Sequence, residues 1–441
     1  MLKLKSSTKL FLTGSQIRKM STKHSLAKRY HGTEKNVWVE FSKLAADYNA
    51  VNLGQGFPDY KPPTFVTEAM KEAANSSNHL LHQYARGFGH QRLCEALSKI
   101  YSPIMGQSIN PMKDILITVG GYGSLYCCIH GFINPGDEVI IIEPYFDCYE
   151  PMVKSAGGVP VFVPLRTMNK ATDGKISSAD WKLDEKEFAK KFNDKTKLLI
   201  FNTPNNPLGK VFSQSELEMI ADLCIKHDVV VVADEVYEWL IFDNKKHLKI
   251  ATLPGMWERT LTIGSAGKTF SVTGWKTGWT IGPAKLLQPA TVIHQNCIYN
   301  VPTITQESVA IAFEHELKFI NTPESYFQYL PAAVTKKRDE LAKVLIDLGM
   351  EPTIPEGGFF MMVNIAPLGI KVPDDGTDDP DDFKFIRWMI KEKRLAAIPP
   401  SAFYSSSNKH LGEKFIRLCI VKEDSTLKAA AEIFKDWKKT L

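Results

Sequence analysis

The stretch LLIFNTPNNPLGKVFSQSELEMIADLCIKHDVVVVADEVY, residues 198–237, contains two apolar runs separated by one amphipathic segment. The runs at 198–201 and 229–234 lack polar alternation, which is typical of strands buried on both faces of a parallel sheet. Between them, Ser213 with Glu216 three residues later predicts a capping box at the start of a helix. Strand, helix and strand in this order predict an α/β unit with helices covering the sheet.

Similar apolar runs flank this unit, and we expect each to form another strand of the same sheet. They lie at 115–119, 138–142, 159–163, 260–265 and 278–282. The last part of the chain differs, because predicted helices at 331–350, 382–398 and 425–440 alternate with strand-like runs at 357–365 and 415–421. We therefore predict the α/β class, with a large domain built on a mostly parallel sheet covered by helices and a smaller α+β domain.

The predicted domain organisation has four parts. Residues 1–33 are expected to form a mitochondrial transit peptide, and residues 34–60 an N-terminal arm that also contributes to the small domain. Residues 61–322 are expected to form the large domain, which carries the candidate site, and residues 323–441 the small C-terminal domain.

The transit-peptide prediction rests on charge. Residues 1–33 contain eight of the 54 Lys and Arg residues and none of the 49 Asp and Glu residues. A basic, Ser/Thr-rich segment without acidic residues is typical of such peptides, and a disordered tail is the alternative. We expect a location in the mitochondrial matrix, with an alternative start at Met20 giving a cytoplasmic form. The remaining 46 basic and 49 acidic residues make the body slightly acidic, so we expect no nucleic-acid partner.

Other partners and metals are not expected from the sequence. No apolar run approaches the length of a membrane span, so we expect no membrane partner. The seven Cys residues show no ladder of spacings, which argues against a disulfide framework and against a zinc module. The Asp-rich loop 374–382 is interpreted as a solvated surface insertion. A calcium site is the alternative, although the loop lacks the usual ligand spacing.

Two lysines, Lys268 and Lys276, lie in the small and polar stretch SAGKTFSVTGWKTGW, residues 265–279. One interpretation is a nucleotide-phosphate loop, but its first Gly would fall at position 262, which is Thr. A plain surface lysine is a second interpretation. The third is a covalent cofactor site, in which a lysine amine forms a Schiff base with the aldehyde of pyridoxal phosphate.

A pyridoxal-phosphate site makes further demands on the sequence. It needs a carboxylate for the pyridine nitrogen, N–H donors for the phosphate and an aromatic face for the ring. Predicted strands end on a candidate for each role: Asp234 for the carboxylate, Gly121 and Tyr122 for the N–H donors, and Phe146 for the aromatic face. A further strand end carries the amide of Asn206. Since the carboxyl ends of parallel strands meet at one edge of a sheet, we expect these groups to converge. For Asp234 alone, a strand-terminating cap is the alternative.

Several of these motifs resemble those of a known family. NTPNNPLGK (202–210), DEVY (234–237) and SAGKTFSVTGWKTGW resemble the fold-type-I pyridoxal-phosphate aminotransferases. NLGQGFPD (52–59), TVGGYGSL (118–125), IIEPYFDCYEPM (141–152) and FIRLCIVK (415–422) narrow the resemblance to the kynurenine–oxoglutarate aminotransferase group. Members of that group are also known as glutamine transaminase K or cysteine-S-conjugate β-lyase. The resemblance extends from about Trp38 to the C-terminus.

The resemblance implies a role for each cofactor-binding residue. Lys268 would form the Schiff base with pyridoxal 5′-phosphate and then act as the base that moves the substrate's α-proton. Asp234 would pair with the pyridine nitrogen, Tyr237 and Asn206 would contact the ring hydroxyl, and Phe146 would stack on the ring. The residues implied for the phosphate are Gly121, Tyr122, Ser265, Lys276 and, from a partner subunit, Tyr84. The resemblance therefore implies a homodimer with shared active sites.

For the substrate, the resemblance implies that Arg417 grips the α-carboxylate and that Trp38, Gly56 and Asn206 border the bound molecule. Tyr299 and Asn300 stand where the family has Phe and His, at positions that line its side-chain pocket. The implied reaction is a ping-pong transfer of the amino group of L-kynurenine, L-glutamine, aromatic or sulfur-containing amino acids to a 2-oxo acid. β-Elimination from cysteine S-conjugates is an expected side activity.

Three alternative functions stay open at this point. The first is a fold-type-I aminotransferase, decarboxylase or lyase with another donor. The second is an ATPase that uses Lys268 on a nucleotide phosphate. The third is a non-catalytic dimerisation module, which would give no reason for the polar groups at the strand ends.

Overall fold

The computed structural model describes residues 24–34, 36–167, 169–320, 322–372 and 374–441. Residues 1–23, including Met20, lie outside the described residues, so the predictions of a transit peptide and of an alternative start remain predictions.

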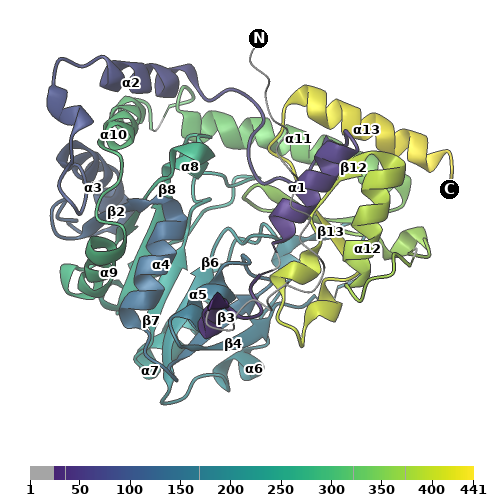
Figure 1. Cartoon of the computed structure of the whole chain (residues 1–441), viewed down its shortest axis with the longest axis horizontal. Coiled ribbons are helices and arrows are strands. Elements are labelled where there is room, and N and C mark those ends of the chain that lie inside the picture. Colours follow the sequence, from purple (N-terminus) through teal and green to yellow (C-terminus); the bar gives the residue numbers. More distant parts are fainter. Residues whose placement is uncertain (1–23, 35, 168, 321, 373) are drawn as a thin grey trace, which may run out of the picture.

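A seven-stranded sheet forms the centre of the large part of the molecule (Figure 1). Its strands are, in spatial order, β2 (Ile115–Val119), β9 (Thr277–Ile281), β8 (Thr260–Ser265), β7 (Val230–Asp234), β6 (Thr196–Asn202), β3 (Glu138–Glu143) and β4 (Val159–Pro164). All pairings from β8 to β4 are parallel, which confirms the predicted mostly parallel sheet. Strand β9 runs against both of its neighbours, because only the short helix α8 (Ala266–Thr269) and a turn connect it to β8.

The strand–helix–strand unit forms as the sequence predicts. Helix α7 (Gln214–Lys226) joins β6 to β7 and begins with the predicted capping box. The Ser213 side chain accepts a hydrogen bond from the Glu216 backbone N–H, and the Glu216 side chain accepts one from the Ser213 N–H. The central strands β6 and β7 are almost wholly buried, as expected for a sheet covered on both faces.

The remaining helices of the large part cover the sheet and its edge at β2. They are α2 (Thr64–Ala74), α3 (Gln91–Met105), α4 (Gly120–Phe132), α5 (Tyr149–Ser155), α6 (Glu185–Ala189), α9 (Ala284–Cys297) and α10 (Thr303–Leu317). Helix α4 packs against α9, and α10 packs against α2 and α3. Two buried clusters of apolar side chains lie on opposite faces of the sheet. One contains Leu199 and Val231, and the other contains Ile200 and Val232, their neighbours along β6 and β7.

The C-terminal part of the chain builds a second, smaller sheet with its own helices. It contains α11 (Tyr326–Leu348), α12 (Asp381–Trp388), α13 (Asp424–Lys438) and a four-stranded sheet of order β13-β11-β10-β5. These strands are β13 (Phe415–Cys419), β11 (Phe360–Asn364), β10 (Glu351–Ile354) and β5 (Ile176–Ser177). The sequence analysis does not predict β10 or β5. Strand β5 comes from within 61–322 and yet pairs with the small sheet.

The N-terminal arm packs against this C-terminal part. In Figure 1, helix α1 (Val37–Asp47), in purple, lies among the yellow elements near the C-terminus. Strand β1 (Val51–Asn52) pairs in parallel with β12 (Leu395–Ala396). The helix predicted over 382–398 is therefore wrong in its second half: α12 ends at Trp388, a single π-helical turn follows, and Arg394 takes a positive φ of 57° before β12 begins. Pairing with β1 overrides the local helical pattern.

An arginine side chain pairs with the acidic side chains of the Asp-rich loop. Arg387, on α12, donates hydrogen bonds to Asp375, Asp379 and Glu40, so a guanidinium occupies the centre of the acidic cluster. Residues 374–378 are exposed, as predicted for a surface insertion. Within the described residues, no group of three or more His, Cys, Asp or Glu side chains could hold a metal ion. In the same residues, no helix is both long enough and apolar enough to cross a membrane.

The close packing of β8 on β9 yields a prediction for stability. A Cβ atom added to Gly264 would lie 2.2 Å from Nε1 of the buried Trp279, whereas one added to the exposed Gly274 would meet nothing within 4 Å. We expect Gly264→Ala to lower the free energy of unfolding by roughly 1–3 kcal/mol, the usual cost of overpacking a core. Gly274→Ala is the matched control. Equal denaturant midpoints for the two variants would contradict the packing described here.

Candidate active site

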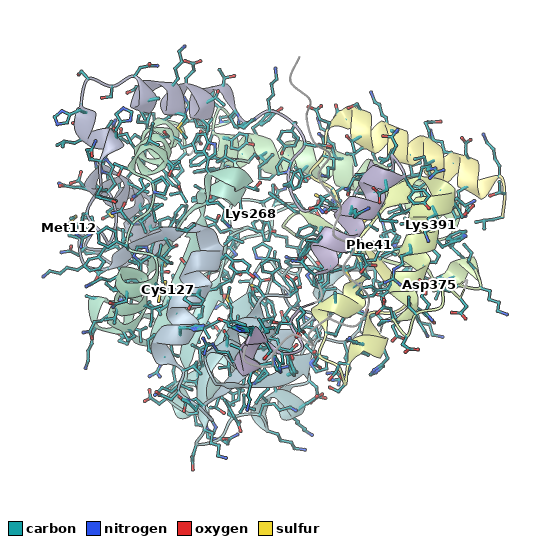
Figure 2. The ribbon with its side chains drawn as sticks, viewed as in Figure 1. Phe41, Met112, Cys127, Lys268, Asp375 and Lys391 are labelled. Atoms are coloured by element: carbon teal, nitrogen blue, oxygen red, sulfur yellow. The ribbon has the colours of Figure 1, made fainter. Side chains whose placement is uncertain are left out.

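A cavity of about 390 Å³ lies between the carboxyl edge of the large sheet and the small sheet. In Figure 2, Lys268 lies near the middle of the molecule, between Cys127 on α4 and Phe41 on α1. Twelve of the residues predicted for the site line this cavity. They are Trp38, Gly56, Gly121, Tyr122, Phe146, Asn206, Asp234, Tyr237, Ser265, Lys268, Lys276 and Arg417.

Lys268 lies on the short helix α8, directly after β8. Its Nζ atom lies 5.5 Å from the centre of the Tyr237 ring and 5.1 Å from that of Phe359. Within the described residues, Nζ makes no hydrogen bond or ion pair by the usual distance criteria. Burial lowers the pKa of this amine to about 8, and the nearby Arg417 and Lys276 charges act in the same direction. Lys268 is therefore far easier to deprotonate than an ordinary lysine.

Asp234 ends β7 and is almost fully buried. Its Oδ2 atom accepts a hydrogen bond of 2.6 Å from the Tyr149 hydroxyl, whereas Oδ1 is buried with no partner among the described residues. Burial raises the pKa of this carboxyl to about 6, and the hydrogen bond from Tyr149 opposes that rise. A buried acceptor without a donor is costly, so Oδ1 suits a ligand that supplies an N–H group.

Arg417, on β13, is fully buried and forms no ion pair within the described part of the chain. Nη1 donates to Oδ1 of Asn206 (3.1 Å) and Nη2 to the carbonyl oxygen of Gly54 (3.0 Å), while Nε has no partner in the same part. The Phe360 ring lies 3.8 Å from the guanidinium carbon. A buried guanidinium without a counter-ion is ready to bind a carboxylate from a ligand.

Trp38 and Asp147 close the same end of the cavity. The Trp38 ring lies 4.9 Å from the guanidinium carbon of Arg417, and its indole Nε1 donates to Oδ2 of Asp147 (2.6 Å). Burial raises the pKa of Asp147, and the Trp38 hydrogen bond and the Arg417 charge oppose that rise. The sequence analysis does not identify Asp147, although it lies inside the quoted motif IIEPYFDCYEPM.

At the other end, an anion site forms at the N-terminus of α4. Gly120 and Gly121 are the first residues of this 13-residue helix, whose free N–H groups and dipole favour an anion. Gly120 takes a positive φ of 66°, which favours glycine, and Lys276 Nζ lies 3.5 Å from the position that a Cβ atom would take there. Lys276 itself takes a positive φ of 53°, and Ser265 also lines this end. A phosphate is the chemical group that fits these donors.

The two lysines therefore differ in role. Lys276 lies at the helix N-terminus where an anion would bind, whereas Lys268 lies among aromatic rings and follows the strand end. Helix α8 has four residues, and the Gly needed at position 262 for a phosphate loop is Thr. The interpretation of Lys268 as a nucleotide-phosphate lysine is therefore wrong.

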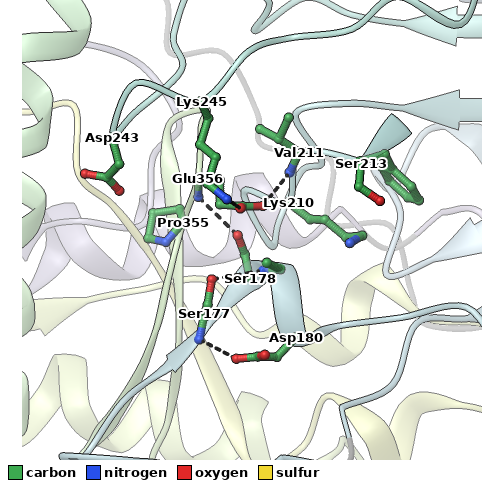
Figure 3. A network of polar contacts seen from close by, with 12 residues as sticks. Ser177, Ser178, Asp180, Lys210, Val211, Ser213, Asp243, Lys245, Pro355 and Glu356 are labelled. Carbon is green, nitrogen blue, oxygen red and sulfur yellow. Dashed lines mark hydrogen bonds and ion pairs between the residues drawn. The ribbon is translucent and has the colours of Figure 1, made fainter. Parts of the chain in front are cut away.

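A network between the two sheets holds the loop that carries Asn206. Figure 3 shows Glu356 between Lys245, Val211 and Ser178. The backbone N–H groups of Glu356 and Gly357 donate to the carbonyl oxygen of Gly209. On the other side of the loop, the Asn206 N–H donates to Oδ1 of Asn202 (2.7 Å). The Asn206 amide is thereby aligned with Arg417.

Three predicted residues do not line the cavity of their own chain: Tyr84, Tyr299 and Asn300. They lie next to one another, with the Tyr84 and Tyr299 rings in an edge contact at 5.6 Å and Asn300 donating to the Ala85 carbonyl oxygen. Tyr84 is 80% exposed and Tyr299 is 58% exposed.

Sequence reasoning also missed Tyr149, Asn202 and Phe360, which line the cavity. Tyr149 comes three residues after the predicted Phe146, and Asn202 directly follows the predicted strand at 198–201. For these two residues, the position beside a predicted strand end was the available signal, whereas Phe360 lies inside the predicted strand 357–365.

Comparison with known proteins assigns the chain to a family. Residues 48–434 match the family described as aminotransferase class I and II. The protein is a class I and II aminotransferase. The mouse kynurenine–oxoglutarate transaminase 3 is 53% identical over 420 residues, covering 95% of this chain and 91% of the mouse protein. The human kynurenine–oxoglutarate transaminase 1 is 48% identical over 415 residues, covering 93% of this chain and 98% of the human protein.

Solved structures show the same fold. The aminotransferase superimposes on Bna3p from Saccharomyces cerevisiae with a TM-score of 0.87 and 33% sequence identity, covering 95% of this chain and 100% of the yeast chain. The predicted α/β fold and the predicted aminotransferase activity are confirmed, and the non-catalytic alternative is wrong.

The geometry around Arg417 gives a prediction for this aminotransferase. Lysine cannot reproduce a planar two-pronged contact with a carboxylate, so Arg417→Lys loses one charge-assisted hydrogen bond to the substrate. A hydrogen bond to a charged group contributes about 1.5–3 kcal/mol. We therefore expect KM for amino donors and for oxo-acid acceptors to rise together by roughly 10- to 100-fold. Steady-state kinetics with both substrates varied would measure this.

Arg338→Lys is the matched control, because Arg338 is also buried but pairs with Asp243, which does not line the cavity. It should change stability and leave KM unchanged. An Arg417→Lys variant with wild-type KM values would place the carboxylate elsewhere.

Proposed function

We propose that this aminotransferase uses pyridoxal 5′-phosphate to transfer the amino group of an aromatic or long uncharged amino acid to a 2-oxo acid. The observation that carries the proposal is one cavity with three complementary groups. Within the described part of the chain, these are the Lys268 amine, which lies among aromatic rings without an ion-pair partner, the Asp234 Oδ1 atom, which accepts no hydrogen bond, and the anion site at α4.

The residues present fit this cofactor. Lys268 would hold its aldehyde covalently, Asp234 Oδ1 would accept from the protonated pyridine nitrogen, and Phe146 would face the ring. Gly121, Tyr122, Ser265 and Lys276 would hold the phosphate, and Tyr237 and Asn206 would contact the ring hydroxyl. When bound, the cofactor supplies an electron sink for the negative charge that develops at the substrate's Cα atom.

The side chains of the aminotransferase would then share the work of proton transfer and orientation. Arg417 would bind the α-carboxylate and so fix the Cα–H bond relative to Lys268. With a pKa lowered to about 8, the Lys268 amine could take the α-proton near neutral pH. A second oxo acid would bind through the same Arg417 fork, which gives a ping-pong sequence.

The lining supports uncharged and aromatic donors. Trp38, Tyr122 and Phe360 offer apolar surface, while the Asp147 carboxylate would repel a donor that carries a second carboxylate. The curated relatives named as kynurenine–oxoglutarate transaminases point in the same direction. We therefore propose L-kynurenine and L-glutamine as donors, together with aromatic and sulfur-containing amino acids. β-Elimination from cysteine S-conjugates is proposed as a side activity.

We further propose a homodimer with shared active sites. The exposed Tyr84 and Tyr299 rings and the neighbouring Asn300 would reach the partner's cavity, where Tyr84 would contact the phosphate. The composition of residues 1–33 supports a mitochondrial matrix location, and Met20 offers a start for a cytoplasmic form.

The proposed function is tested by the visible absorption of the protein after incubation with pyridoxal phosphate. We expect a visible band that disappears when excess kynurenine or glutamine is added and returns with an oxo acid. Because Lys268 would be both attachment point and base, Lys268→Ala should lose this band and all measurable transamination. Lys276→Ala should keep the band at saturating cofactor and weaken only cofactor binding.

Each alternative result has its own meaning. A wild-type protein that stays colourless with added cofactor would reject the proposed cofactor. Turnover of the donor without any oxo acid would favour a lyase or decarboxylase.

The shared site is tested by mixing two inactive variants. A dimer of Tyr84→Ala with Lys268→Ala contains one cavity with both residues intact, because each chain would supply Tyr84 to its partner. We expect activity to reappear after the two variants are unfolded and refolded together, but not after they are refolded separately. No recovery in refolded dimers of proven mixed composition would contradict a shared site.

A further inference from the structure

Tyr149 begins helix α5 at the floor of the cavity, and it is 1% exposed. Its ring lies 6.4 Å from the Tyr145 ring in a stacked arrangement and 6.1 Å from the Phe146 ring in an edge contact. These contacts fix the direction of the phenol, since a buried ring between two others has little freedom to rotate. The hydroxyl points at Oδ2 of Asp234, 2.6 Å away.

Asp234 has two inequivalent oxygens as a result. Oδ2 is occupied by the Tyr149 hydroxyl, and Oδ1 is buried without a partner in the described part of the chain. The peptide group of Asp234 is fixed as well, because its carbonyl oxygen accepts from Asn202 Nδ2 and from the Thr203 N–H. Among the side chains of the described residues, Tyr149 is the one that donates a hydrogen bond to this carboxylate.

The same hydrogen bond affects the charge of Asp234. Burial favours the protonated form, and a donor to the carboxylate favours the ionised form. The charged and titratable groups that face Asp234 are Lys268 from α8, Glu235 directly after β7, Tyr237, and Cys148 beside Tyr149. Of the influences that lower the pKa of Asp234, the Tyr149 hydrogen bond is the largest, the Val236 backbone N–H is the second and the Lys268 charge is the third.

We propose that Tyr149 is a positioning residue for Asp234: its hydroxyl holds one carboxylate oxygen so that the other faces the cofactor's ring nitrogen in the ionised state. This inference rests on the proposed use of pyridoxal phosphate. A protonated Asp234 cannot form an ion pair with a pyridinium nitrogen, so Tyr149 acts on the cofactor only through Asp234.

The test is the affinity of the cofactor-free protein for pyridoxal phosphate, followed by quenching of tryptophan fluorescence between pH 6 and pH 9. Tyr149→Phe removes only the hydroxyl group. We expect Kd at pH 7 to rise by roughly ten- to a hundred-fold, the usual effect of losing a hydrogen bond to a charged group. Without the donor the pKa of Asp234 rises, so the ratio of variant to wild-type Kd should grow as pH falls and shrink as pH rises.

Tyr145→Phe is the matched control. Tyr145 is also buried, lies four residues away and stacks on Tyr149, but its hydroxyl donates to Glu150 instead of Asp234. The Tyr145→Phe variant should bind pyridoxal phosphate with the wild-type Kd at every pH, so that the ratio of variant to wild-type Kd stays near one. A Tyr149→Phe protein with the wild-type affinity and the wild-type pH profile would overturn the proposal.

A double-mutant cycle separates positioning from a merely structural effect. If Tyr149 acts through Asp234, then Tyr149→Phe should have little further effect on Kd in an Asp234→Asn background. Additive losses would overturn the proposal, and circular dichroism of each cofactor-free variant would identify any that fails to fold. In that event, the 3-fluorotyrosine replacement at 149 keeps the hydroxyl and strengthens the donor, so Kd should not rise. A wild-type protein that does not bind pyridoxal phosphate would reject the proposed function itself.

Discussion

Two buried charges of opposite sign face one cavity without pairing with each other. Asp234 leaves Oδ1 without a partner and Arg417 leaves Nε without one, within the residues that the structure describes. Such groups destabilise a folded protein, because desolvation is not repaid by a bond. The surrounding structure maintains them through hydrogen bonds to their remaining atoms, from Tyr149 to Asp234 and from Arg417 to Asn206 and Gly54. The site keeps its binding capacity at a cost in stability that the large core offsets.

The two charges belong to different sheets. Asp234 ends β7 in the large sheet, and Arg417 lies in β13 of the small sheet. The spacing between them therefore depends on how the two sheets are joined. Glu356 and Gly209 make one such junction, and Glu143 makes another by accepting hydrogen bonds from Ser405 and Asn408. Both junctions lie close to segments that line the cavity. They therefore fix the distance between Asp234, which would face the cofactor, and Arg417, which would bind the substrate carboxylate.

Local patterns in the sequence predicted the strands that end at the site and the capping box of α7. They also predicted the strand-end residues Gly121, Tyr122, Phe146, Asn206 and Asp234 and the stretch that holds both lysines. Those features depend on short-range signals, such as apolar runs and the residue that follows each run. The other cavity residues were implied only by the resemblance to the family, and they are Trp38, Gly56, Tyr237, Ser265 and Arg417. The antiparallel direction of β9, the strand β5 and the end of α12 could not be predicted, because pairing with distant segments decides them. Tyr149 and Asp147 were missed for the same reason, since their partners lie 85 and 109 positions away in the chain.

The connection of Arg417 to Gly54 has a consequence for how the molecule is made. These residues are separated by 363 positions, and β1 can pair only after its distant partner β12 has been synthesised. Contacts of such high sequence separation form late, since the loops that they close must first become ordered. During synthesis, the segment with Asp234 and Lys268 leaves the ribosome well before the segment with Arg417. The residues of this chain that would hold the cofactor ring and phosphate are thus synthesised before Arg417, which would hold the substrate carboxylate.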